Sequence, residues 1–215
     1  MNKANINKEI TKLLTSKMLP YKELMTYYRC AMMEVETKFK VLNEELSLGK
    51  DRNPIETIKT RLKSPESIAE KIIRKNISPT IENIEKEISD IAGVRVICSY
   101  PSDIYKLAEA FLAQDDINLI EKKDYFENPK DNGYRSLHLI VETPIFLQSS
   151  KKLMKVEIQF RTLSMDWWAS LEHKISYKKD VPDDVRQKIG DSLLFCSKIA
   201  ADLDLKMESI AKMID

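Results

Sequence analysis

Two acidic residues stand beside strongly apolar stretches, a pattern typical of a site built on a sheet. Asp90 precedes the run IAGVRVIC, and Glu157 lies within the run VEIQFR. Side chains alternate along a strand, so Glu157 should share one face with Gln159 and Arg161, opposite the apolar face of Val156, Ile158 and Phe160. Two such carboxylates could hold one hard cation such as Mg²⁺, which uses few protein ligands and leaves positions for phosphate oxygens.

Basic residues gather in the segment 59–75: Lys59, Arg61, Lys63, Lys71, Arg74 and Lys75. Arg61 and Lys63 alternate on one strand face, and the last three fall on one side of a helix. A triphosphate needs several such donors, and guanidinium planes also stack on bases. Arg95, five residues after Asp90, extends this cationic wall. The alternative interpretation is a solvated charged surface.

The segment 132–138 combines a turn with aromatic and imidazole side chains. Asn132-Gly133 allows a sharp turn. A strand that begins at Tyr134 would place Tyr134, Ser136 and His138 on one face, where the ring can stack on a base and the histidine can bind a phosphate or ribose. The alternative is a half-buried strand with a solvent-facing histidine.

A helix after Glu157 carries both tryptophans, Trp167 and Trp168, which we expect to be packing residues. Three polar residues share that helix: Asp166, Glu172 and His173. They either face the site or cap and brace the helix, and the pattern does not choose between these roles.

Composition limits the class of protein. The chain has 215 residues, 43% of them hydrophobic, which suits one domain with a substantial core. Its formal net charge of +1 gives no global attraction to nucleic acid or membrane. The three cysteines have neither metal-site nor disulfide spacing, and no apolar stretch is long enough for a signal peptide or a membrane span. A cytoplasmic location fits best.

Hydrophobic periodicity predicts an α+β fold, a mixed sheet flanked by helices. We expect a single domain, 1–215, with N-terminal helices in 1–50, a core in 51–178 and a C-terminal helical region in 179–215. Ser64-Pro65 and Ser78-Pro79, each a cap residue followed by a first-turn proline, predict the starts of helices that run to about Asn76 and Ser89. Other helices are predicted at 20–48, 103–114 and 163–178, and from Pro182 onward with a break near Gly190. Strands are predicted at 54–62, 92–99, 117–126, 134–143 and 153–161.

Together these motifs resemble the RelA/SpoT-type synthetases of the alarmones ppGpp and pppGpp. The resemblance rests on RLK at 61–63, DIAGVR at 90–95, NGYRSLH at 132–138, VEIQFRT at 156–162 and WASLEH at 168–173. It covers roughly residues 55–178. It implies the family's nucleotidyltransferase-like sheet and a GTP/GDP diphosphokinase, in which the 3′-hydroxyl of GDP or GTP attacks the β-phosphorus of ATP and AMP leaves.

The resemblance also implies roles for individual residues. Asp90 and Glu157 would hold Mg²⁺, with Glu157 as the candidate general base. The residues implied for ATP are Arg61, Lys63, Ser67, Lys71, Arg74 and Arg95. Those implied for GDP or GTP are Lys130, Asn132, Tyr134, Arg135 and His138, with Tyr134 stacked on guanine.

The short length is similar to that of the small, single-domain synthetases, in particular the tetrameric branch that responds to pppGpp. A homotetramer formed through the terminal helices is therefore expected, with pppGpp as an allosteric ligand; Asp166 stands where that branch commonly has asparagine. Hydrolase activity is not expected, because that site needs several metal-binding histidines and this chain has two in all. The alternatives are a relative that pyrophosphorylates the 3′ end of tRNA, and a non-catalytic nucleotide- or RNA-binding module.

Overall fold

The computed structural model describes residues 8, 10–12, 18–48, 52–176 and 181–213. Five strands form one mixed sheet in the spatial order β1-β2-β5-β4-β3. The strands are β1 (Ile55–Leu62), β2 (Ala92–Cys98), β3 (Asn118–Asp124), β4 (Leu137–Phe146) and β5 (Lys151–Thr162). β2 and β5 run parallel, and every other neighbouring pair is antiparallel. The predicted α+β fold with a mixed sheet is confirmed.

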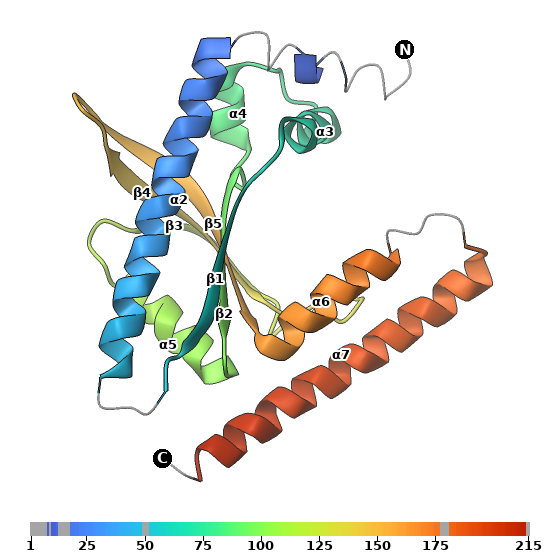
Figure 1. The fold of residues 1–215 in the computed structure, drawn as a ribbon. Coiled ribbons are helices and arrows are strands. Elements are labelled where there is room, and N and C mark those ends of the chain that lie inside the picture. The colour runs from blue at the N-terminus through green and yellow to red at the C-terminus, as the bar shows by residue number, and fades with distance from the viewer. Residues whose placement is uncertain (1–7, 9, 13–17, 49–51, 177–180, 214–215) are drawn as a thin grey trace.

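Helices α2 (Met18–Ser47) and α5 (Pro101–Leu112) cover one face of this sheet (Figure 1). The buried side of α2 carries apolar residues at helical spacing: Leu24, Tyr28, Ala31, Val35, Phe39 and Leu42. The Phe39 ring stacks on Phe111 of α5 at 4.6 Å between centroids and meets Phe160 of β5 edge-on at 5.4 Å. These contacts put the hydrophobic core on one side and leave the opposite sheet face for polar residues.

The predicted alternation in β5 is confirmed. Val156, Ile158 and Phe160 are completely buried against the core, whereas Glu157 and Gln159 are partly exposed on the other face. The register of the sheet therefore decides which polar residues lie next to Glu157.

Two short helices, α3 (Pro65–Lys75) and α4 (Ile81–Glu87), connect β1 to β2. Ser64 caps α3 as predicted, since its Oγ accepts from the Ser67 amide at 3.3 Å. The predicted start of the second helix at Ser78-Pro79 is wrong. Thr80 is the cap instead, and its hydroxyl accepts from the Asn83 amide at 3.2 Å, so that the helix begins at Ile81.

Helices α6 (Leu163–Ser176) and α7 (Asp183–Ala211) pack against each other on the side of the sheet away from α2 (Figure 1). Positions 177 and 178, also predicted as helix, lie outside the described residues. Trp168 is buried and its indole Nε1 donates to the Leu193 carbonyl at 2.9 Å, so its packing role is confirmed. Trp167 is 63% exposed, so the same prediction is wrong for it.

The predicted break at Gly190 is also wrong, because α7 continues through this position. A mid-helix glycine costs about 1 kcal/mol relative to alanine, which is little compared with the packing available along so long a helix. No described helix combines the length and hydropathy that a membrane span requires.

Candidate active site

Strand register gathers the predicted residues on the polar face of the sheet. Arg61 of β1 pairs with Gly93 of β2, and Gly93 pairs with Glu157 of β5, so these residues form one row. Glycine carries no side chain, so space stays open above the sheet between Arg61 and Glu157. The next row consists of Lys59, Arg95, Gln159 and His138.

A cavity of about 580 Å³ lies over these rows. Both predicted acidic residues line it, Asp90 from the turn before β2 and Glu157 from β5. It is also lined by cationic and polar groups from β1, the residue after it, α3 and β2: Lys59, Arg61, Lys63, Ser67 and Arg95. The cavity therefore offers two carboxylates beside several phosphate-binding groups.

Asp90 is held by two lysines. Lys63 Nζ lies 2.7 Å from Oδ2, and Lys71 Nζ lies 2.7 Å from Oδ1. Partial burial raises the pKa of Asp90, but the hydrogen bonds and charges of Lys63 and Lys71 outweigh it and hold the pKa below its ordinary value. Asp90 is thus ionised at neutral pH.

Glu157 is contacted by an amide and an imidazole, whereas Asp90 is contacted by lysines. Gln159 Nε2 donates to its Oε2 at 2.9 Å, and His138 Nδ1 lies 3.5 Å from its Oε1. Burial raises the pKa of Glu157, but His138 and Gln159 outweigh it and lower the pKa; the charge of Asp90 acts in the raising direction. Both carboxylates line the same cavity.

Not every residue predicted for ATP reaches the cavity. Lys71 is within reach through its ion pair with Asp90. Arg74 is exposed in the last turn of α3 and is not among the described residues that line the cavity. Its predicted contact with ATP phosphates thus has no support from this arrangement.

An aromatic cluster adjoins Glu157 on the other side. The Tyr134 hydroxyl lies 2.9 Å from His138 Nε2 and accepts from Arg161 Nη2 at 3.0 Å. Lys130 Nζ lies over two rings, 4.7 Å from the centroid of Tyr125 and 5.0 Å from that of Tyr134. Such rings surrounded by cations suit a base that carries phosphates.

The prediction that Tyr134, Ser136 and His138 share a strand face is wrong, because β4 begins at Leu137. Ser136 is completely buried and its hydroxyl donates to the Phe160 carbonyl at 2.9 Å. Tyr134 comes from the loop before the strand, and it meets His138 through its hydroxyl rather than by strand alternation.

The loop 130–136 is positioned by its own side chains and by α7. Asn132 Oδ1 accepts from the Tyr134 amide at 3.1 Å, and Gly133 has φ 88°, as the predicted turn requires. The Ser197 hydroxyl of α7 donates to the Gly133 carbonyl. A Cβ at position 133 would lie 2.7 Å from Ser197 Cβ, so a side chain there would collide with α7.

Arg135 also braces this loop. Its Nη1 donates to the Phe126 carbonyl at 3.2 Å, which ties the two ends of the loop together. This contact gives Arg135 a structural role alongside the predicted one in binding phosphates.

Asp166, whose role the sequence left open, lies inside the site. Its Oδ1 accepts from Arg161 Nη1 at 3.1 Å and from Arg95 Nη1 at 3.2 Å, and its Oδ2 accepts from Lys59 Nζ at 2.9 Å. Burial raises the pKa of Asp166, but Lys59 and the two guanidiniums outweigh it and lower the pKa.

The alternation in 156–161 placed Gln159 and Arg161 on the face of Glu157, and in the structure they contact Glu157 and Tyr134. One further residue of the site, Tyr125, was not singled out from the sequence. Tyr125 has no such signal, since its position depends on how the loop after β3 folds back over β4.

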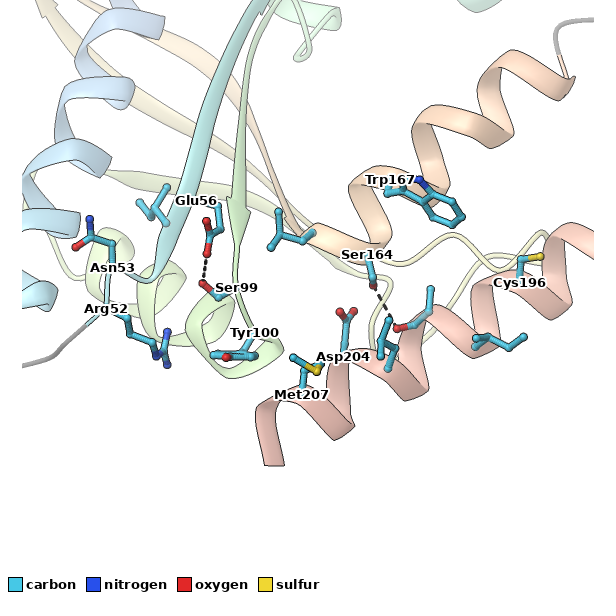
Figure 2. A pocket seen from close by; sticks show the side chains of 15 residues that line it. Arg52, Asn53, Glu56, Ser99, Tyr100, Ser164, Trp167, Cys196, Asp204 and Met207 are labelled. Atoms are coloured by element: carbon cyan, nitrogen blue, oxygen red, sulfur yellow. Dashed lines mark hydrogen bonds between the residues drawn. The ribbon is translucent and has the colours of Figure 1, made fainter. Parts of the chain in front are cut away.

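A second, larger and more apolar cavity of about 1050 Å³ lies between α7 and the ends of β1 and β2 (Figure 2). Its apolar lining comes mainly from α6 and α7: Leu163, Trp167, Ile199, Leu203 and Met207. At its floor Asp204 accepts from the Thr162 hydroxyl at 2.6 Å, and the Ser164 hydroxyl donates to the Ala200 carbonyl at 3.3 Å. We call this cavity the α7 groove. Neither Asp90 nor Glu157 lines it, so it is distinct from the candidate active site.

Comparisons with known proteins show the family of this chain. Residues 60–181 match the family model described as "Region found in RelA / SpoT proteins". The chain is 44% identical to GTP pyrophosphokinase YwaC of Bacillus subtilis over 202 residues, which cover 94% of this chain and 95% of YwaC.

Solved structures are similar as well. The small alarmone synthetase 2 of Bacillus subtilis superposes with a TM-score of 0.79 at 43% identity, covering 90% of this chain and 98% of that one. The small alarmone synthetase 1 from the same organism, bound to its product pppGpp, gives 0.79 at 35% identity, covering 90% and 97%. The same synthetase bound to AMPCPP gives 0.72 at 32% identity with the same coverage. The sheet, the motifs and these matches together show that the chain belongs to the RelA/SpoT family, among its small alarmone synthetases.

Proposed function

We propose that this protein transfers pyrophosphate from ATP to the 3′-hydroxyl of GDP or GTP, which gives ppGpp or pppGpp and AMP. The observation that carries the proposal is the placement of Asp90 and Glu157 in one cationic cavity, with Tyr134 and His138 beside Glu157. ATP occupies the side of Arg61 and Arg95, and the guanine nucleotide occupies the side of Tyr134.

The residues present fit a magnesium ion. Asp90 and Glu157, both ionised, line one cavity, and Mg²⁺ needs only one or two protein carboxylates beside substrate phosphates. Asp90 and Glu157 would hold the Mg²⁺ ion, which would supply charge neutralisation on the transferred group.

The side chains then have mainly to position and neutralise, since phosphoryl-type transfer asks little covalent chemistry of the protein. Arg61 of β1 faces the base of ATP, and Lys63, directly after β1, faces its phosphates. Arg95 offers its plane to the adenine from β2. A guanine stacked on Tyr134 replaces Lys130 on the ring and leaves that ammonium for the phosphates of the acceptor.

Glu157 accepts the proton of the attacking hydroxyl. The new P–O bond forms between the 3′-oxygen and the β-phosphorus, while the bond to the α-phosphate oxygen breaks and AMP leaves. Glu157 is ionised at neutral pH and can accept this proton, and its lowered pKa makes it a weaker base than an unperturbed carboxylate.

The direct test is product analysis after incubation with ATP, Mg²⁺ and one acceptor. GDP should yield ppGpp, GTP should yield pppGpp, and each product should be accompanied by one AMP. Reactions without a guanine nucleotide, and reactions with tRNA as the acceptor, are the controls. Labelled tRNA with unchanged GDP and GTP would overturn the proposal, as would an absence of AMP in every reaction.

We also infer that the protein is a homo-oligomer, most simply a tetramer. Much of the apolar surface that was predicted on α2 packs on its own sheet, so that helix contributes less to assembly than expected. α7, by contrast, leaves large apolar side chains exposed: Phe195, Ile199, Leu203, Leu205, Met207 and Ile210. Exposed patches of this kind, continuous with the α7 groove, suit a second copy of the chain.

Because the chain resembles the tetrameric branch of the family, light scattering should give about four times the mass of one chain. Phe195→Glu, at a side chain that is 64% exposed, should lower the mass by placing a charge in the apolar contact. Gln187→Glu adds the same charge at an exposed polar position of α7 and should leave the mass unchanged. A monomeric mass for the wild-type protein at micromolar concentration would contradict the inference.

A further inference from the structure

Neither the sequence motifs nor the proposed reaction assigns a role to Asp166. It is only 7% exposed and does not line the cavity, so it is not placed to contact a nucleotide directly. Its carboxylate is nevertheless shared by Lys59, Arg95 and Arg161, at distances of 2.9 to 3.2 Å.

The carboxylate allows two guanidiniums to lie side by side. Burial and the charge of Arg161 both lower the pKa of Arg95, and Asp166 acts in the opposite direction. Like charges at close range repel strongly when partly removed from water. Without an anion between them, Arg95 and Arg161 would therefore move apart or turn toward solvent.

The first of these guanidiniums, that of Arg95, lies on the ATP side of the site. Arg95 lines the cavity with a side chain that is one-third exposed, while one edge of its fork is bound by Asp166. A guanidinium held by one edge keeps its plane fixed and its face available for stacking on a base.

The second guanidinium, that of Arg161, lies on the side proposed for the guanine nucleotide. Arg161 is buried; its Nη2 donates to the Tyr134 hydroxyl at 3.0 Å, and its Cζ lies 5.1 Å from the centroid of that ring. Since Tyr134 comes from a loop rather than from a strand, its ring is held by side-chain contacts, and those with Arg161 are among them.

We propose that Asp166 is a positioning residue for both nucleotides, holding Arg95 for ATP and, through Arg161, the Tyr134 ring for GDP or GTP. This inference rests on the proposed function for the identity of the two ligands. In this role Asp166 acts on the two substrates within one protomer, and no contact between protomers is needed.

The test uses Asp166→Asn and direct binding of AMPCPP and of GDP, each titrated by calorimetry with Mg²⁺. Loss of hydrogen bonds to charged groups should raise the Kd of each nucleotide roughly tenfold. Removing a negative charge would by itself tighten the binding of polyphosphates, so the direction of the change separates positioning from simple charge. Turnover at saturating substrate should fall less than the affinities.

Two further variants sharpen the comparison. Asp166→Glu keeps the charge but lengthens the side chain; positioning predicts weaker binding of both nucleotides, by about threefold or more, because small displacements in such sites are costly. It also keeps the test decisive where Asp166→Asn does not fold. Asp202→Asn removes an exposed aspartate on α7 that pairs with Lys206, and it should leave both affinities unchanged.

Unchanged or tighter binding of both nucleotides by folded Asp166→Asn would overturn the inference, and so would wild-type affinities in Asp166→Glu. Weaker binding of AMPCPP with unchanged binding of GDP would refute the part of the inference in which Asp166 acts on GDP through Arg161 and Tyr134. These outcomes are independent of product formation, so a wild-type protein that binds both nucleotides but makes no alarmone would refute the proposed function and leave the role of Asp166 standing.

Discussion

Glu157→Gln is expected to abolish nearly all synthesis while leaving the fold intact. The amide has almost the same size, and Glu157 is on the polar face rather than in the core, so packing changes little. What is lost is a negative charge beside the donor phosphates and the group that accepts the proton. Removal of one such electrostatic element typically costs on the order of 10²–10³ in rate, and loss of a general base adds to that.

The measurement is AMP release with ATP and GDP, together with the melting temperature. Glu142→Gln is the matched control, since Glu142 lies on β4 next to β5 but does not line the cavity. Near-normal turnover by Glu157→Gln, with an unchanged melting temperature, would refute the catalytic role.

Tyr134→Ala is expected to weaken the binding of GDP far more than the binding of ATP. Stacking of a base on an aromatic ring is worth roughly 1–3 kcal/mol, which corresponds to a loss of affinity of about fivefold to a hundredfold. The ring is also approached by Lys130 and Arg161, so its removal releases two cations that would otherwise surround the base.

Tyr134→Phe separates the ring from its hydroxyl. Phenylalanine keeps the stacking face but loses the contacts of the hydroxyl with His138 and Arg161, so its effect on GDP should be milder than that of alanine. Calorimetric titration of AMPCPP and GDP checks both variants. Equal losses for the two nucleotides in Tyr134→Ala would mean that Tyr134 is not the guanine platform.

Much of the fold follows from local patterns in the sequence. The alternation in 156–161 predicted correctly which side of β5 is buried, and the Ser64-Pro65 pair predicted the start of α3. These features depend on neighbours a few residues away, whose spacing is dictated by strand and helix geometry. The error at Thr80 occurs where a hydroxyl hydrogen bond, rather than hydrophobic spacing, decides where a helix begins. The error at Leu137 occurs where the pairing with β3 and β5 decides where a strand begins.

The sequence by itself determined which residues could do the chemistry: two lone acids, a set of basic residues and a tyrosine after an Asn-Gly turn. Only the tertiary structure decided which of them meet. The parallel pairing of β2 with β5 places Gly93 beside Glu157 and so brings Asp90 into the same cavity, whereas Arg74 is left outside. The packing of α6 over the end of the sheet turns Asp166 into the shared partner of Arg95 and Arg161. Local spacing carries no information about such contacts, because they depend on register and packing between segments that are far apart in the chain.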